Sequence, residues 1–419
     1  MKKIVFSIFI LMVAAFLTAC SSGSSAEKKV IEVALWDENV KGAVDASIEA
    51  FNEIHPDVEV KVTYTPYANY WTKLKTSLGG GSGPDVFWMN GPNFYRYSTD
   101  GLIKNLEPFI GEDDEFNKDA YVPAVVDMYS VEDELYAAPY FTDSVGLYYN
   151  KQLFDEAGVD YPDETWTWED IETEGAKLVN PDEGVFGYAA HTTVNQQGYY
   201  NLIHQAGGFM INEDKTESGF DSPEAKEAFA FIKDLIDKGI SPSTQNQIET
   251  ESKQLFMSNK LAMIPAISVN TPEFYEALGE NLGVAPLPKG KQAASIVHGI
   301  GWAMNEKVED EEVAWDLIKS LTSEQANKDI AESGFSIPAM QSTGEIWLGS
   351  VPSLDLQVFL DAQEEGVGVA YPISKRTTEW QDIETKEIQG AFLEDTSIDE
   401  ALDRVAEGMN KILEEENNE

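Results

Sequence analysis

The sequence predicts an α/β fold of two lobes, each built on a mainly parallel sheet flanked by helices. Strand-like segments, in which apolar and polar residues alternate, are followed by segments with helical periodicity. This order is typical of parallel strands joined by helices. The chain has 419 residues, of which 42% are hydrophobic, and it exceeds what one hydrophobic core usually holds. In such sheets ligands bind beyond the carboxyl ends of the strands, so the residues there are the first candidates for a site.

The first part of the chain alternates regularly between strand and helix signals. The stretch from Val30 is β-branched and alternating, whereas the stretch from Ala43 places apolar residues on one helical face. A glycine-rich run, residues 79–83, ends the second helix. We therefore expect strands at 30–35, 57–64 and 84–89, and helices at 43–54 and 70–78.

The rest of the chain continues the pattern with longer helices. Ser222 is a good N-cap and Pro223 fits the first helical position, so a helix begins there and ends at Gly239. A strand-like segment at 139–149 has a middle that could cross between the lobes. Other strand-like segments lie at 281–288 and 299–304, and other helices at 151–158, 165–179, 310–320, 323–333 and 398–415.

The N-terminal leader carries the signs of export. Lys2 and Lys3 precede a short apolar run, residues 4–17, which small residues close just before Cys20, the only cysteine. The arrangement resembles a bacterial lipobox, which implies a signal peptide at 1–19 and a lipidated, flexible tether at 20–29. We expect an anchor in the cell membrane facing the extracellular side, or the periplasmic side in a host with an outer membrane. A plain secretory signal with an incidental cysteine is the alternative.

The chain is strongly acidic. Its net charge is −45, and removal of Lys2 and Lys3 with the leader makes it −47. A field of this sign repels nucleic acid and anionic lipid, which excludes both as partners and leaves the lipid anchor as the membrane contact. Two interpretations remain, a solubilising surface and capture of a cationic ligand. Many acids fall at helix-like surface positions, which favours the solubilising surface.

Eight short motifs, in order, carry a resemblance to a known family. Each motif alone is weak, but their order and spacing behind a lipobox are specific. They are FNEIHP (51–56), GPDV (83–86), LYYNKQLF (147–154), TWTWED (165–170), LAM (261–263), APLP (285–288), GIGW (299–302) and AW (314–315). Taken together, the mature chain resembles a family 1 extracellular solute-binding protein of an ABC importer, the group that includes maltose-binding protein.

The resemblance implies a type II periplasmic-binding-protein-like fold with three hinge crossings. We expect the crossings near 141–143, 298–301 and 337–345. The N-terminal lobe, called the first lobe below, then comprises 30–141 and 301–340. The C-terminal lobe, called the second lobe, comprises 142–300 and 341–419. Ligand that contacts both lobes would stabilise the closed form.

One group of candidate ligand contacts lies at the strand ends of the first lobe and near the first crossing. Aromatic faces stack on sugars, and amides and carboxylates hydrogen-bond vicinal hydroxyls. Asp143 stands in an otherwise apolar strand, where a carboxylate is costly unless something binds it, and it matches an acidic ligand position of the family. The other candidates are Trp36, Asp37, Glu38, Trp71 and Asn90. Alternative roles are a solvated loop for residues 36–38, a turn for Asn90 and core packing for Trp71.

Candidate contacts of the second lobe come from two loops and Trp380, and Trp302 is a candidate at a crossing. The amide-rich loop 191–199 precedes an apolar helix, and a second loop follows the strand that ends at Ile267. By the resemblance, the expected contacts are Asn195, Gln197, Tyr199, Ser268, Asn270 and Trp380. Trp302, after two glycines at a crossing, is a further candidate, with hinge packing as its alternative. The family's tryptophan near Val269 is missing, which disfavours a long maltodextrin.

The expected function is capture of a sugar or oligosaccharide and its delivery to the transmembrane subunits and cytoplasmic ATPase of an importer. We expect a monomer without cofactor or metal. A polyol, a phosphodiester or a cationic compound is the alternative ligand. A phosphate would favour arginines, and the chain has only Arg96, Arg376 and Arg404.

Motifs of enzymes are missing from the sequence. The four histidines show no metal-binding spacing, no Gly-x-Ser-x-Gly elbow occurs, and the glycine run at 79–83 lacks the lysine of a phosphate loop. No pair of carboxylates stands out among the 74 acidic residues. A binding protein is therefore expected, and a secreted carbohydrate-active enzyme is the alternative.

Overall fold

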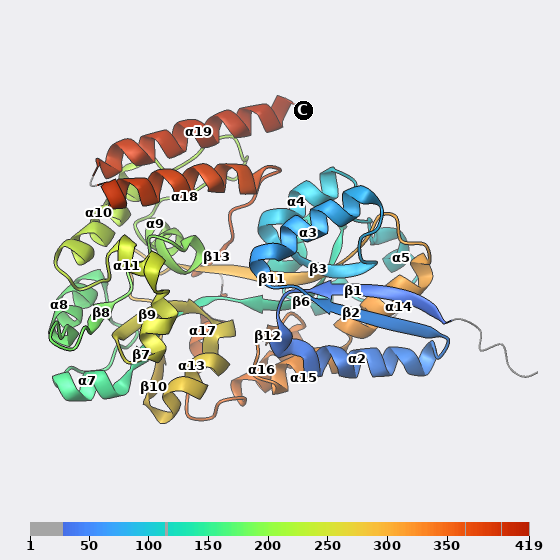
Figure 1. The fold of residues 1–419 in the computed structure, drawn as a ribbon, viewed down its shortest axis with the longest axis horizontal. Coiled ribbons are helices and arrows are strands. Elements are labelled where there is room, and N and C mark those ends of the chain that lie inside the picture. Colours follow the sequence, from blue (N-terminus) through green and yellow to red (C-terminus); the bar gives the residue numbers. More distant parts are fainter. Residues whose placement is uncertain (1–27, 114–115, 365, 395, 419) are drawn as a thin grey trace, which may run out of the picture.

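A computed structural model describes residues 28–113, 116–364, 366–394 and 396–418 of the chain. The predicted signal peptide, Cys20 and most of the predicted tether lie outside the described residues. Two lobes stand side by side and are joined by strands that run between them (Figure 1). No helix within the described ranges is long and apolar enough to cross a membrane.

The sheet of the first lobe has seven strands. Their main order is β12-β6-β11-β3-β1-β2, and β13 pairs with β11. Strand β1 is parallel to both β2 and β3, whereas β11 is antiparallel to β3 and β6. The strands are β1 (Lys29–Leu35), β2 (Val58–Tyr64), β3 (Val86–Asn90), β6 (Ala137–Asp143), β11 (Ser295–Met304), β12 (Ile337–Pro338) and β13 (Gly368–Ala370). A small hairpin, β4 (Ser130–Val131) and β5 (Glu134–Leu135), lies outside this sheet.

The sheet of the second lobe has four strands in the order β10-β7-β9-β8. Strand β7 is antiparallel to both neighbours, and β8 is parallel to β9. In each sheet, one strand next to a crossing runs antiparallel to most of the others. This strand is β11 in the first sheet and β7 in the second. The strands are β7 (Val145–Asn150), β8 (Phe186–Tyr188), β9 (Leu261–Ile267) and β10 (Leu282–Ala285).

Helices cover both faces of the first sheet (Figure 1). Helix α2 buries Ala43, Val44 and Phe51 and packs beside α14 and α15, whereas α3 and α4 lie on the opposite face. The helices of this lobe are η1 (Glu38–Val40), α2 (Lys41–Ile54), α3 (Tyr67–Gly80), α4 (Gly91–Thr99), α5 (Glu107–Gly111), η2 (Lys118–Ala120), α6 (Pro123–Met128), α14 (Glu311–Thr322) and α15 (Glu324–Glu332).

The second lobe is richer in helices. Ser222 acts as the expected N-cap, because its hydroxyl accepts from the Ala225 amide, and Thr167 forms a capping box with Asp170 at the start of α8. Helices α18 and α19 pack together along one edge. The helices are α7 (Lys151–Ala157), α8 (Trp168–Leu178), η3 (Asn195–Tyr199), α9 (Tyr200–Gln205), α10 (Pro223–Asp237), α11 (Thr244–Glu249), α12 (Ser252–Met257), η4 (Ser268–Asn270), α13 (Thr271–Leu278), η5 (Gly279–Asn281), α18 (Thr377–Glu394) and α19 (Ile398–Asn418).

The chain passes between the two sheets at several points. Strands β6 and β7 are separated only by Ser144, whose hydroxyl donates to the carbonyl of Phe359. Strand β11 starts beside the second lobe, where the Ser295 hydroxyl bonds the backbone of Val145, and ends within the first sheet. A third excursion leaves the first sheet after β12, reaches β7 of the second lobe through α17 (Gln357–Asp361), and returns to the first sheet at β13. It also carries η6 (Gln341–Thr343) and α16 (Gly344–Leu348).

Candidate functional site

An aromatic cluster stands at the carboxyl ends of β1 and β3. Trp36, directly after β1, lies with its ring centroid 5.6 Å from that of Tyr67 and 5.7 Å from that of Trp71. Trp88 of β3 supports Trp36 from within the core, at 4.8 Å. Tyr67, the first residue of α3, is 52% exposed, so the cluster offers aromatic surface to solvent. Tyr67 is not among the predicted contacts, although its neighbourhood (PYANYW, 66–71) is rich in aromatic residues.

The polar residues beside this cluster are partly engaged in local structure. Asn90 ends β3, donates to the Tyr67 hydroxyl at 3.1 Å and caps α4 through the Asn93 amide at 3.3 Å. Asp37 accepts from the Asn39 amide at 2.9 Å and so caps η1, while Glu38 is exposed. Asn90 therefore both turns the chain and fixes the outermost ring of the cluster.

Asp143, the last residue of β6, is buried and bonded from the second lobe. Its Oδ1 accepts from Gln196 Nε2 at 2.7 Å, and its Oδ2 lies 3.6 Å from His298 Nδ1. His298 Nε2 accepts from the Gly91 amide at 3.1 Å, which leaves the ring proton on Nδ1, facing the carboxylate. A Cβ at Gly91 would lie 3.3 Å from the His298 ring, so glycine permits this close approach.

The π-helix η3 carries three of the expected contacts of the second lobe, Asn195, Gln197 and Tyr199. At Gly198 the backbone leaves the helical region, and an added Cβ there would lie 2.7 Å from the His191 side chain. Asn195 accepts from the Gln196 amide at 2.7 Å and from the Tyr371 hydroxyl at 3.4 Å. Gln197 is half-buried and makes no side-chain hydrogen bond with the described residues.

A buried carboxylate holds this π-helix in place. Glu384 of α18 is fully buried and accepts from the hydroxyls of Tyr199 and Tyr200 and from Asn195 Nδ2, the last at 3.4 Å. Burial raises the pKa of Glu384 to about 7, although these donors oppose the shift. Sequence reasoning missed Glu384, because a glutamate in a helix is ordinarily read as a surface residue.

Three expected contacts have no surface with which to meet a ligand, and this corrects the predicted set. Trp302 is fully buried in the first-lobe core, 5.8 Å from Trp88 between ring centroids, in agreement with the packing interpretation. Trp380 is fully buried and donates from Nε1 to the Ser374 hydroxyl at 3.0 Å. Ser268 is also fully buried, whereas Asn270, two residues on, is half-buried and lines a cavity.

Two cavities adjoin these elements. One, of about 440 Å³, lies within the second lobe and includes Gln197 and Asn270 in its lining. The other, of about 830 Å³, lies between α6 of the first lobe and the segments 209–215 and 368–373. No group of three metal-ligating side chains occurs among the residues that the structure describes.

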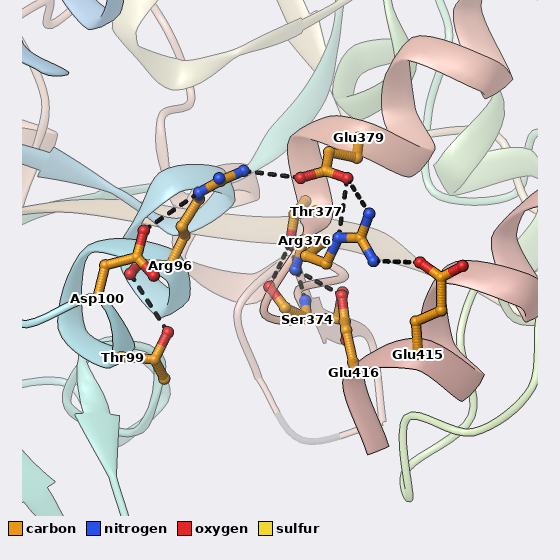
Figure 2. A network of polar contacts seen from close by, with 9 residues as sticks. All are labelled: Arg96, Thr99, Asp100, Ser374, Arg376, Thr377, Glu379, Glu415 and Glu416. Carbon is orange, nitrogen blue, oxygen red and sulfur yellow. Dashed lines mark hydrogen bonds and ion pairs between the residues drawn. The ribbon is translucent and has the colours of Figure 1, made fainter. Parts of the chain in front are cut away.

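Charged contacts also join the two lobes away from the aromatic cluster. Figure 2 shows Arg96 of α4 reaching across to Glu379 of α18, at 2.8 Å. Arg376 contacts the same carboxylate and also bonds Glu415 at 2.6 Å. Nearby, the ammonium of Lys215 lies 4.6 Å from the ring centroid of Tyr95 on α4.

The two sheets, the crossings between them and the polar residues that meet there define a two-lobed solute-binding protein of type II. The chain belongs to the family described as bacterial extracellular solute-binding protein, whose family model matches residues 37–328. The proteins of this family bind solutes, and the family is extracellular.

Relatives and solved structures extend over most of the chain. The galactooligosaccharide-binding protein of Bacillus subtilis is 28% identical over 359 residues, 80% of each chain. The ABC substrate-binding protein of Listeria monocytogenes in complex with cycloalternan is 25% identical, covers 92% of this chain and 99% of its own, and has a TM-score of 0.86. A solute-binding protein of Thermotoga lettingae bound with α-D-tagatose has the same fold, at 22% identity, 92% and 100% coverage and a TM-score of 0.82.

Proposed function

We propose that this protein is the substrate-binding component of an ABC importer and captures a neutral sugar or oligosaccharide between its lobes. The observation that carries the proposal is the meeting of Asp143 and Gln196 between the lobes, near an exposed aromatic cluster at the strand ends. Relatives named as binders of galacto- and arabino-oligosaccharides support it.

The chemistry of the proposed contacts suits a neutral polyol ring. Trp36, Tyr67 and Trp71 supply faces for stacking on C–H surfaces. Asp143, Asn195 and Gln197 supply oxygens and amides that pair with vicinal hydroxyls. A ligand held by both groups stabilises the closed arrangement by its greater affinity for that arrangement.

An anionic ligand receives little support. Arg96 and Arg376 share the Glu379 carboxylate, and Arg404 bonds Glu387 at 2.6 Å. Each of the three arginines is therefore engaged by a carboxylate, and a phosphate would have to break one of these pairs.

The remaining parts of the proposal concern location and partners. A lipid on Cys20 would tether the folded part to the outer face of the membrane, and a monomer would present the closed lobes to the permease. Labelling with palmitate tests the anchor: label that persists in Cys20→Ala would sink it. We further propose that the protein performs no chemistry, which mass spectrometry of sugars after prolonged incubation tests, since cleavage products would contradict it.

The direct test is thermal unfolding of the purified protein with a panel of mono- and oligosaccharides. A ligand at about 100 times its dissociation constant adds roughly 2.7 kcal/mol and shifts the melting temperature by a few degrees. We expect a shift with one class of neutral sugar. If only cationic solutes raise the melting temperature, the ligand is a cation and not a sugar. A cationic ligand would agree with the net charge of −45.

A further inference from the structure

We propose that His298 is a positioning residue of the sugar site, and that protonation of its ring weakens sugar binding. The neutral ring accepts from the Gly91 amide at the start of α4 and faces the Asp143 carboxylate, so it fixes two parts of the first lobe that carry proposed ligand contacts. The inference rests on the proposed function and adds a residue that is not itself expected to touch the ligand. His298 is 7% exposed and lies in β11, at a crossing between the lobes.

Neighbouring strands fix the place of His298. In the register of β11 against β6, His298 stands opposite Asp143, and its carbonyl accepts from the Thr142 hydroxyl at 2.9 Å. The preceding carbonyl, of Val297, accepts from the amide of Tyr371, just after β13, at 3.0 Å. The rings of Tyr371 and His298 form a T-shaped pair with 5.3 Å between their centroids. The imidazole is therefore held in place from three strands.

The ring of His298 satisfies the first amide of α4. The first amides of a helix have no partner within the helix and need acceptors from elsewhere. The Gly91 amide donates to His298 Nε2 at 3.1 Å. Pro92 has no N–H, and the Asn93 amide donates to the Asn90 side chain at 3.3 Å. Because an amide N–H can only donate, Nε2 must be without a proton for this contact to exist.

Both nitrogens of the ring adjoin proposed ligand contacts. Asn90 precedes Gly91, and its Nδ2 donates to the hydroxyl of Tyr67, the exposed ring of the aromatic cluster, at 3.1 Å. On the other side of the imidazole, Nδ1 lies 3.6 Å from Asp143 Oδ2. A change at either nitrogen therefore acts on a residue that is expected to bind the sugar.

Protonation reverses the role of Nε2. The imidazolium carries a proton on both nitrogens and has no acceptor left for the Gly91 amide. Two N–H groups would then face each other, and the positive ring would stand at the positively polarised N-terminus of α4. The imidazolium would also form an ion pair with Asp143, which leaves the carboxylate less free to accept from sugar hydroxyls. Both effects weaken sugar binding.

The titratable groups around this pair are few. Asp143 of β6 is the carboxylate that faces the ring, and it also accepts from Gln196 of η3. Burial raises the pKa of Tyr371, after β13, and of Tyr129, after α6, so both hydroxyls stay neutral in mildly acidic solution. Histidine is the side chain that ordinarily changes its charge between pH 5 and 8.

The test is calorimetry of the full-length protein at pH 7.5 and pH 5.5 with a galacto-, an arabino- and a malto-oligosaccharide. We expect the unaltered protein to bind the sugar about fivefold to tenfold more weakly at pH 5.5. In His298→Gln an uncharged amide takes the place of Nε2 and can accept from the Gly91 amide. Its affinity should match that of the unaltered protein at pH 7.5 and change by no more than about twofold at pH 5.5.

Two further variants complete the design. In His298→Asn the shorter amide reaches only the place of Nδ1, so affinity should be about fivefold lower at both pH values. His55→Gln is the matched control, because His55 pairs with Asp316 at 2.9 Å between α2 and α14, and it should keep the full dependence on pH. Burial lowers the pKa of His191 and His204 to about 4, so both stay neutral at pH 5.5. Glu384 is present in every protein and cancels in the comparison.

The outcomes separate the role of His298 from the proposed function. If the unaltered protein binds a neutral sugar equally well at the two pH values, or if His298→Gln loses as much affinity at pH 5.5 as the unaltered protein does, the role of His298 is wrong and the proposed function stands. If no neutral sugar binds at either pH, both are wrong. A loss at pH 5.5 that His55→Gln retains and His298→Gln lacks supports the positioning role.

Discussion

Gln196 Nε2 and Asp143 Oδ1 form a hydrogen bond of 2.7 Å that joins the π-helix of the second lobe to the last residue of β6 in the first. The carboxylate is buried, and His298 approaches its other oxygen. The Asp143 carboxylate lies between the lobes, where we expect the ligand to bind, and it already accepts a hydrogen bond from Gln196. Hydroxyls of a sugar can extend or replace this donor.

Loss of the Asp143 carboxylate should weaken sugar binding strongly. Hydrogen bonds to charged groups contribute about 1.5 to 3 kcal/mol, so we expect Asp143→Ala to reduce affinity by roughly 10-fold to 100-fold. Calorimetric titration measures this loss. Asp45→Ala is the control, because Asp45 is a surface carboxylate that only pairs with Lys41 on α2. An unchanged affinity in Asp143→Ala would remove Asp143 from the site.

Truncation to alanine should affect ligand affinity at Tyr67 and folding stability at Trp302. Tyr67 is 52% exposed, so Tyr67→Ala should lower ligand affinity with little change in the free energy of unfolding. Trp302 is fully buried, so Trp302→Ala should cost about 3 to 5 kcal/mol of stability through the cavity it leaves. Urea unfolding and calorimetry on both variants check this. A stable Trp302→Ala that no longer binds sugar would restore Trp302 as a ligand contact.

The buried Glu384 predicts a dependence of stability on pH. Its pKa is raised from 4.5 to about 7 in the folded protein, so the folded state binds more protons than the unfolded state between these values. The stability of the folded state therefore falls as the pH rises through this window, by on the order of 3 kcal/mol at most. Tyr199, Tyr200, Tyr371 and Asn195 face Glu384 and carry no charge that would offset it.

Glu384→Gln isolates this contribution. We expect the stability of the unaltered protein, relative to that of Glu384→Gln, to be lower at pH 8 than at pH 5 when both proteins are unfolded with urea. The other acids titrate equally in both proteins, so they cancel in the difference. A relative stability that stays constant across this range would show that Glu384 titrates normally.

The ion pair of Arg96 and Glu379 should favour approach of the lobes. Both side chains are about one-third exposed, so the pair contributes less than about 1 kcal/mol, and we expect Arg96→Ala to weaken ligand binding by no more than about fivefold. The difference should shrink at high salt, because salt screens such pairs. Titration at low and high ionic strength measures it. Lys233→Ala, which breaks a pair within α10, should show neither effect.

Much of the fold could be predicted because local signals agree with the tertiary structure. Ser222 and Pro223 begin α10, and the alternating segments appear as β1 and β2. The segment 139–149 could be read as a strand through a crossing, and it appears as β6 and β7 around Ser144. Residue type and periodicity suffice for such features.

The site could be predicted only in part, because burial is set by distant segments. Trp36 and Trp302 look alike in the sequence, yet one ends a strand at the surface and the other lies between β3 and β6 in the core. Gln196 is not among the predicted contacts, although its neighbours Asn195 and Gln197 are, because no local signal shows which amide of the π-helix bonds Asp143. The role of Glu384 follows from hydrogen bonds with Tyr199 and Tyr200, which lie almost 200 positions earlier in the sequence.

The most direct test of the central claim is calorimetric titration of the purified protein and of Asp143→Ala with the panel of neutral sugars. The account predicts saturable binding of one sugar class by the unaltered protein and a loss of at least about tenfold in the variant, whose melting temperature without ligand stays close to that of the unaltered protein. Absence of binding to every neutral sugar, or equal binding by both proteins, would contradict it.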